Sequence, residues 1–177
     1  MKFMEGRIFM KPIAIVYTSH TGHTAEYAHR LGKQLRLPVF SLEQALSGLS
    51  TGSAVIYLGW LMAGTVKNYR KAAKKFQICA VCGVGLCDTG ALRHEIRKNN
   101  RIPASTAVFT LQGGMDHEKL QGLYKKMIAT LTKVMSAKKN RSADEERMLE
   151  LLQTDKSYVC DENLTDVLVW AQKNGEK

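Results

Sequence analysis

The stretch that decides the fold is Ile13-Ala14-Ile15-Val16-Tyr17-Thr18-Ser19-His20-Thr21-Gly22-His23-Thr24. Its first half is an apolar run typical of a buried strand, and a helix-like run from Ala25 to Leu35 follows its hydroxyl-rich second half. At such a turn, backbone N–H groups and hydroxyls converge where the helix dipole favours negative charge. The turn lacks the Lys of a P-loop and the spaced glycines of a dinucleotide turn. It therefore predicts a site for one terminal phosphate, and a well-capped helix after a buried strand is the alternative.

Apolar runs alternate with helical patterns along the rest of the chain at the spacing of β-α units. The expected strands are Ile13–Thr18, Pro38–Phe40, Ala54–Gly59, Gln77–Gly83 and Thr106–Leu111. The expected helices are Thr21–Leu35, Val66–Phe76, Thr89–Asn99, Asp116–Met135, Ala143–Leu152 and Glu162–Gln172, with a weak turn near Leu42–Leu46. Strands that are apolar throughout suit a parallel sheet that is covered on both faces. The pattern predicts an α/β fold with a doubly wound, five-stranded parallel sheet and helices on both faces.

The length of 177 residues predicts a single domain over residues 1–177, with an N-terminal extension at 1–11 and a C-terminal helical part at 136–177. No apolar run approaches the ~20 residues of a membrane span. The N-terminus lacks the pattern of a signal peptide. The four cysteines form only half of a paired zinc motif, so we expect no metal site and a reduced, cytoplasmic setting.

The net charge of +10 is unevenly distributed. Residues 1–115 hold 15 Lys and Arg against 5 Asp and Glu, whereas residues 116–177 hold 11 of each kind. Five basic residues at helical spacing form an expected basic face: Lys67, Arg70, Lys71, Lys74 and Lys75. An all-basic face repels itself and attracts anions, although charge runs are usually just solvated faces.

Three expected loops leave the carboxyl ends of parallel strands, where open sheets bind their ligands: 19–24, 59–64 and 83–90. The second loop holds Trp60, which would cover a flat ring or, alternatively, pack into the core. Glycines in the third loop allow the backbone to approach a ring edge, and a flexible turn is the alternative. Together the loops predict a ligand with a phosphate at one end and a planar ring at the other.

The pattern Ser19-x-Thr21-Gly22-x-Thr24 is similar to the FMN-phosphate loop of the flavodoxin-like family. The segment Thr110–Leu120 resembles the branch of that family that includes the menaquinone-dependent protoporphyrinogen oxidases of bacteria. The resemblance covers roughly residues 11–172 and implies a flavodoxin-like fold that holds FMN noncovalently. It implies that the phosphate is held by Ser19, His20, Thr21, Gly22, His23 and Thr24, one flavin face by Trp60, Leu61, Met62 and Ala63, and the pyrimidine edge or other face by Cys82, Gly83, Val84 and Gly85.

One departure from the family concerns aromatic residues. The third loop of the family often presents a Tyr to the flavin, but no aromatic residue lies between Gln77 and Arg101. This departure weakens the expectation of a two-sided aromatic sandwich, and with it the expectation of tight binding and a very low reduction potential.

The resemblance implies an FMN-dependent oxidoreductase or an electron carrier. The basic balance favours an acidic redox partner, an anionic membrane surface or an anionic substrate such as a propionate-bearing porphyrin, and therefore a protein of the protoporphyrinogen-oxidase type. The alternative is a non-catalytic binding module with a basic docking face and degenerate flavin loops. The basic residues are not interleaved with stacking aromatics, which argues against nucleic acid as the partner.

Overall fold

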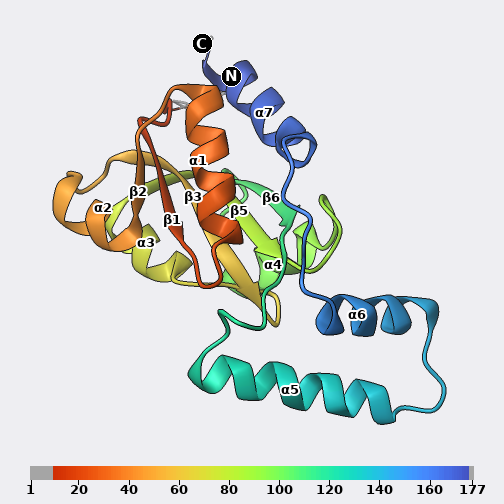
Figure 1. Cartoon of the computed structure of the whole chain (residues 1–177). Helices are drawn as coiled ribbons and strands as arrows, with labels where there is room; N and C mark the ends of the chain where they lie inside the picture. The colour runs from red at the N-terminus through yellow and green to blue at the C-terminus, as the bar shows by residue number, and fades with distance from the viewer. Residues whose placement is uncertain (1–9, 176–177) are drawn as a thin grey trace.

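A parallel sheet with strand order β2-β1-β3-β5-β6 forms the centre of the molecule (Figure 1). The computed structural model describes residues 10–175, so most of the extension expected at 1–11 lies outside the described residues. The strands of the sheet are β1 (Ala14–Thr18), β2 (Val39–Ser41), β3 (Ala54–Met62), β5 (Gln77–Gly85) and β6 (Ala107–Gln112). The predicted α/β class and five-stranded parallel sheet are confirmed, and the strand order is compatible with a flavodoxin-like fold.

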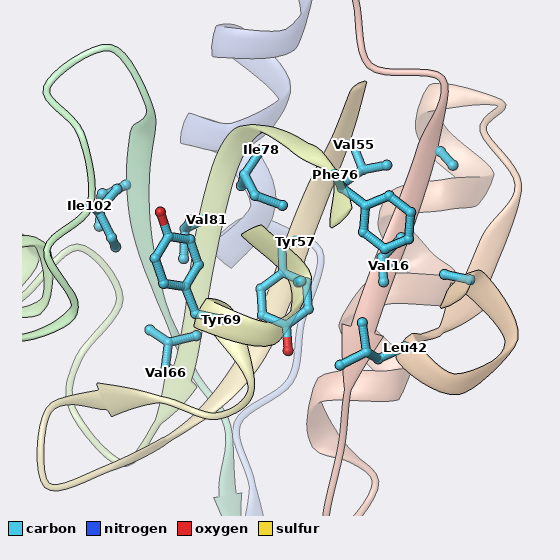
Figure 2. Packing of buried hydrophobic residues seen from close by; sticks show 14 of the residues in the cluster. Val16, Leu42, Val55, Tyr57, Val66, Tyr69, Phe76, Ile78, Val81 and Ile102 are labelled. Carbon is cyan, nitrogen blue, oxygen red and sulfur yellow. The ribbon is translucent and has the colours of Figure 1, made fainter. Parts of the chain in front are cut away.

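Helices cover both faces of this sheet. They are α1 (His23–Leu35), α2 (Leu42–Gly48), α3 (Tyr69–Lys75), α4 (Arg93–Asn100) and α7 (Thr165–Gly175). Alternate residues of β3 divide between two cores, since successive side chains of a strand point to opposite faces. Val55 and Tyr57 pack with α2, α3 and α4, where Figure 2 shows Tyr57 beside Tyr69. Ile56 and Leu58 pack with α1 and α7.

Between β6 and α7 the chain makes an excursion away from the sheet. It consists of β7 (Gly114–Met115), α5 (Gly122–Ala137), α6 (Ala143–Gln153) and β8 (Lys156–Ser157). The antiparallel β7–β8 ladder closes its base, and Tyr158 donates its N–H to the Gly113 carbonyl over 2.7 Å. A Cβ atom at Gly114 would collide with the Lys156 carbonyl, so the ladder requires glycine there. Figure 1 shows α5 at the edge of the molecule, below the sheet.

The expected helix over 66–76 begins later than predicted. Thr65 and Val66 form strand β4, in which Val66 pairs antiparallel with Leu61 of β3. Asn68 then takes a left-handed conformation with φ 59°, and α3 begins at Tyr69. Strand pairing therefore prevails over helical periodicity at the start of this segment.

Two further boundaries differ from the prediction. The helix expected from Asp116 begins at Gly122, because the Asp116 carboxylate accepts the Lys119 N–H over 3.2 Å in a separate turn. The weak turn near residue 42 is the complete helix α2, with a capping box made by Ser41 and Gln44. Among residues 10–175, no helix combines the length and the apolar composition needed to cross a bilayer.

Candidate functional site

The carboxyl ends of β1, β3 and β5 open into one cavity of about 860 Å³. Ten of the fourteen predicted binding residues line it: His20, Thr21, His23, Thr24, Trp60, Leu61, Met62, Ala63, Val84 and Gly85. The other four, Ser19, Gly22, Cys82 and Gly83, do not line the cavity. Parts of β7, α4, α5 and α6 complete its wall, and none of these was predicted to contribute. The parallel topology thus brings the three predicted segments together.

The turn between β1 and α1 presents polar groups that have no partner in the described chain. Gly22 precedes α1 with φ 106°, and no described side chain caps the helix. The first N–H groups of a helix have no intrahelical acceptor, so those of α1 are free to bind an acceptor. Ser19 Oγ and His20 Nε2 are buried and likewise lack a hydrogen-bond partner among residues 10–175. Donors without acceptors at a helix N-terminus are the chemistry of an anion site.

His23 lies at the inner end of this turn. Its Nδ1 atom is 3.0 Å from Thr21 Oγ1, so the ring is fixed against the hydroxyl of its own turn. Burial lowers the pKa of His23, while Asp116 and Glu26 act in the opposite direction. The ring is therefore held mostly neutral near pH 7, and the positive potential of the turn comes from the backbone.

The predicted second loop is a β-hairpin and not an irregular loop. Strand β3 continues to Met62, and Trp60 pairs in register with Val84 of β5. The turn residues Ala63 and Gly64 have φ angles of 47° and 74°. Positive φ at both central residues is the type I′ geometry that matches the twist of a hairpin. The hairpin holds Trp60 in a regular strand at the cavity wall.

Asn100 anchors this hairpin to α4. Its Oδ1 accepts the Val66 N–H over 2.9 Å, and its Nδ2 donates to the Gly64 carbonyl over 2.9 Å and to the Ile96 carbonyl over 2.8 Å. The side chain is 4% exposed, so water cannot replace these bonds easily. A buried amide thus fixes the position of the Trp60 hairpin.

The third predicted segment lies mostly inside β5, which extends to Gly85. Cys82 is completely buried in the core, and burial raises the pKa of its thiol to about 12. The side chain of Leu61 covers Gly83 and Gly85, since a Cβ atom at Gly83 would lie 2.9 Å from Leu61 Cδ2. Of the four residues predicted here, only Val84 and Gly85 reach the cavity, and Leu86 and Cys87 further along the loop also line it.

Tyr124 of α5 supplies an aromatic ring that the sequence did not predict for the site. Its ring lies edge-on to Trp60, with centroids 4.8 Å apart, and His20 stacks on Trp60 at 5.4 Å. Lys67 Nζ donates to the Tyr124 hydroxyl over 2.8 Å and lies 5.7 Å from the Trp60 ring centroid. An aromatic cluster with one cation therefore forms one end of the cavity.

The backbone around Lys67 is held by β3. The Tyr57 hydroxyl donates to the Lys67 carbonyl over 2.7 Å and accepts from Thr18 Oγ1 over 2.8 Å. Burial raises the pKa of Tyr57 well above its usual value, so this donor stays protonated. Lys67 also donates its own N–H to the Trp60 carbonyl over 2.9 Å. The same strand thus positions the aromatic ring and the cation.

The expected basic face is consequently divided. Lys67 precedes α3 and donates to the hydroxyl of Tyr124 in the cavity wall, and Lys75 donates to the Leu46 carbonyl in α2. Arg70, Lys71 and Lys74 remain exposed on α3. The continuous five-residue face was a wrong expectation, because β4 pairing takes Lys67 out of the helix.

The remaining wall of the cavity is apolar and belongs largely to α5. Four of its residues, which we call the apolar stripe, line the cavity and are exposed: Leu123, Met127, Leu131 and Val134. Apolar residues recur at helical spacing along α5, yet none of the residues of this helix is buried.

The chain carries no sign of a metal centre in its described part. All four cysteines are free thiols. Residues 10–175 contain no group of three or more His, Cys, Asp and Glu side chains placed to hold a metal ion.

Comparisons of the chain with protein-family models, with curated proteins and with solved structures find no significant match.

Proposed function

We propose that this protein binds FMN noncovalently in the cavity at the carboxyl end of its sheet and acts as a redox protein. The observation that carries the proposal is the pairing of two chemistries in one cavity. The uncapped α1 turn, whose residues His20, Thr21 and His23 line the cavity, suits a phosphate. The aromatic cluster of Trp60 and Tyr124 suits a planar ring.

In this proposal, different residues bind the phosphate and the ring of FMN. The hydroxyl of Thr21 and the first N–H groups of α1 hold the phosphate, and His20 lies beside them in the cavity wall. Trp60 and Tyr124 cover the ring, so that α5 provides the aromatic side chain that the third segment lacks. When bound, FMN supplies the chemistry by accepting one or two electrons and passing them on.

We extend the proposal to an oxidoreductase with an anionic substrate that has an apolar body, such as a propionate-bearing porphyrinogen. The size of the cavity and its apolar α5 wall leave room beside a ring ligand. Lys67 and Lys126 place positive charge at this wall. The exposed residues Arg70, Lys71 and Lys74 would attract an acidic redox partner. The resemblance of Thr110–Leu120 to the protoporphyrinogen-oxidase branch supports the same class, in a cytoplasmic protein that works at a membrane periphery.

The visible absorption spectrum of the purified protein tests the proposal. We expect a yellow protein, or one that becomes yellow on titration with FMN, whose colour bleaches with dithionite. The double variant Thr21→Ala with Thr24→Ala should lower the affinity for FMN by on the order of 100-fold. The reason is that lost hydrogen bonds to a charged group cost about 1–3 kcal/mol. The same double variant should change the affinity for riboflavin, which has no phosphate, by less than about threefold.

Two outcomes would overturn the proposal. A colourless protein that takes up no FMN would favour the non-catalytic binding module, and equal losses of affinity for FMN and riboflavin would contradict the phosphate site.

For the substrate class, a porphyrinogen with free propionates should bleach the bound flavin at least about 10-fold faster than its neutral methyl ester, because charge steering raises association rates. Equal rates would refute the anionic substrate and leave the FMN site intact.

A further inference from the structure

Helix α5 exposes a row of large apolar side chains that its own fold does not need. The residues of the apolar stripe follow one another at helical spacing, and Leu123 and Val134 are 70% and 63% exposed. Leu92 also lines the cavity and is 54% exposed. A contiguous exposed apolar patch on a protein surface marks an interaction site.

The packing of α5 against the rest of the protein uses a different face of the helix. Ile128 and Met135 pack with Met148 and Leu152 of α6 in a small separate core. Tyr124 points to the cavity, where it contacts Trp60. The residues of the apolar stripe are not members of this core, so they are separate from the contacts that hold α5 against α6.

The charge of the segment identifies the kind of partner. Residues 120–143 contain no Asp or Glu and six basic residues: Lys125, Lys126, Lys133, Lys138, Lys139 and Arg141. Lys138 pairs with Glu145 at 2.5 Å, and Arg141 donates to carbonyls at the end of α5. Lys125, Lys126 and Lys133 form no ion pair with any residue of the described range 10–175. A helix that combines an exposed apolar stripe with unpaired lysines matches an anionic partner that has an apolar interior.

We propose that α5 is an interfacial helix that docks this protein on an anionic lipid bilayer. The apolar stripe enters the boundary between headgroups and acyl chains, and the lysines contact the anionic headgroups. Figure 1 places α5 at the edge of the molecule. A second copy of the chain fits less well, because two α5 helices would bring only positive charges together. This proposal does not depend on FMN.

The surface has a consequence for the cavity. Because the stripe also lines the cavity, a bilayer that contacts the stripe would adjoin the cavity. An apolar molecule dissolved in the membrane then reaches the aromatic cluster without crossing water.

Sedimentation of the full chain with lipid vesicles tests the proposal. We expect binding to vesicles that contain phosphatidylglycerol, weaker binding at high salt, and little binding to pure phosphatidylcholine. Lys125→Gln with Lys126→Gln and Lys133→Gln should lower the partition coefficient by on the order of 100-fold. Leu123→Gln with Val134→Gln should lower it by at least about 10-fold at low and high salt, because apolar contacts are not screened.

The matched control removes three exposed charges from α3, by Arg70→Gln with Lys71→Gln and Lys74→Gln. It should leave the partition coefficient within about threefold of wild type, because these charges lie on another helix and none of them lines the cavity with the apolar stripe. Equal loss in the α3 and α5 charge variants, or no binding to anionic vesicles, would overturn the proposal. If the protein does not bind vesicles but forms a dimer that dissociates on Leu123→Gln with Val134→Gln, the apolar stripe instead binds a second copy of the chain. Thermal unfolding of each variant checks that the fold is intact.

Discussion

Asn100 joins the β3–β4 hairpin to α4, and its replacement by Ala tests how far one buried amide holds the Trp60 wall in place. Asn100→Ala leaves the N–H of Val66, which is 2% exposed, without an acceptor. An unsatisfied buried group costs about 1–3 kcal/mol, and the lost bond to the half-buried Gly64 carbonyl adds about 1 kcal/mol. We therefore expect the free energy of unfolding to fall by roughly 2–4 kcal/mol.

Urea unfolding followed by circular dichroism measures this loss. The midpoint should fall with an unchanged m-value, because the surface exposed on unfolding stays the same. Asn99→Ala is the matched control, since Asn99 is the exposed neighbour, and it should change stability by less than about 0.5 kcal/mol. A loss below about 1 kcal/mol for Asn100→Ala, or equal losses for both variants, would refute the anchoring role of this side chain.

Two further predictions concern the hairpin turn and the turn that precedes α1. Ala63 adopts a left-handed conformation before Gly64, and Asn tolerates that conformation better than Ala does. In thermal unfolding, Ala63→Asn should therefore stabilise the protein by about 0.5–1 kcal/mol. Ala63→Val should destabilise the protein. Because the pKa of His23 is lowered in the folded protein, the unfolded chain binds a proton at His23 first as the pH falls. His23 therefore reduces the free energy of unfolding progressively below about pH 6.5. In the His23→Gln variant, the urea midpoint should depend less on pH between pH 7.5 and 5.5. Parallel pH profiles for wild type and His23→Gln would contradict the second expectation.

The frame of the sheet could be predicted because each strand is a local apolar run bounded by turn residues. Strand β1, expected at 13–18, is observed at Ala14–Thr18, and the alternation with helices fixed the parallel topology. That topology alone brings segments that follow different strands to one edge, so ten of the predicted residues meet in one cavity. Short strands such as β4 escaped prediction, since two residues carry no periodicity.

The other half of the site depends on contacts between distant segments. Nothing near Trp60 in the sequence indicates that Tyr124 lies against it. Helical periodicity groups Leu123 with Leu131 on one face of α5, but it cannot say whether another element covers that face. The absence of acidic residues from 120–143 was the available signal that this helix differs from an ordinary covering helix.

The β7–β8 ladder makes the α5–α6 excursion a replaceable unit. The chain leaves the sheet at Gly113 and returns at Tyr158, and these two residues are joined by one backbone hydrogen bond. A short turn grafted between Gly114 and Ser157, which already pair, would close the chain without moving a strand of the central sheet. Insertions and exchanges of helices can therefore accumulate at this point while the turn between β1 and α1 stays fixed. The same sheet can acquire a new cavity wall, and with it a new partner, through changes confined to one segment.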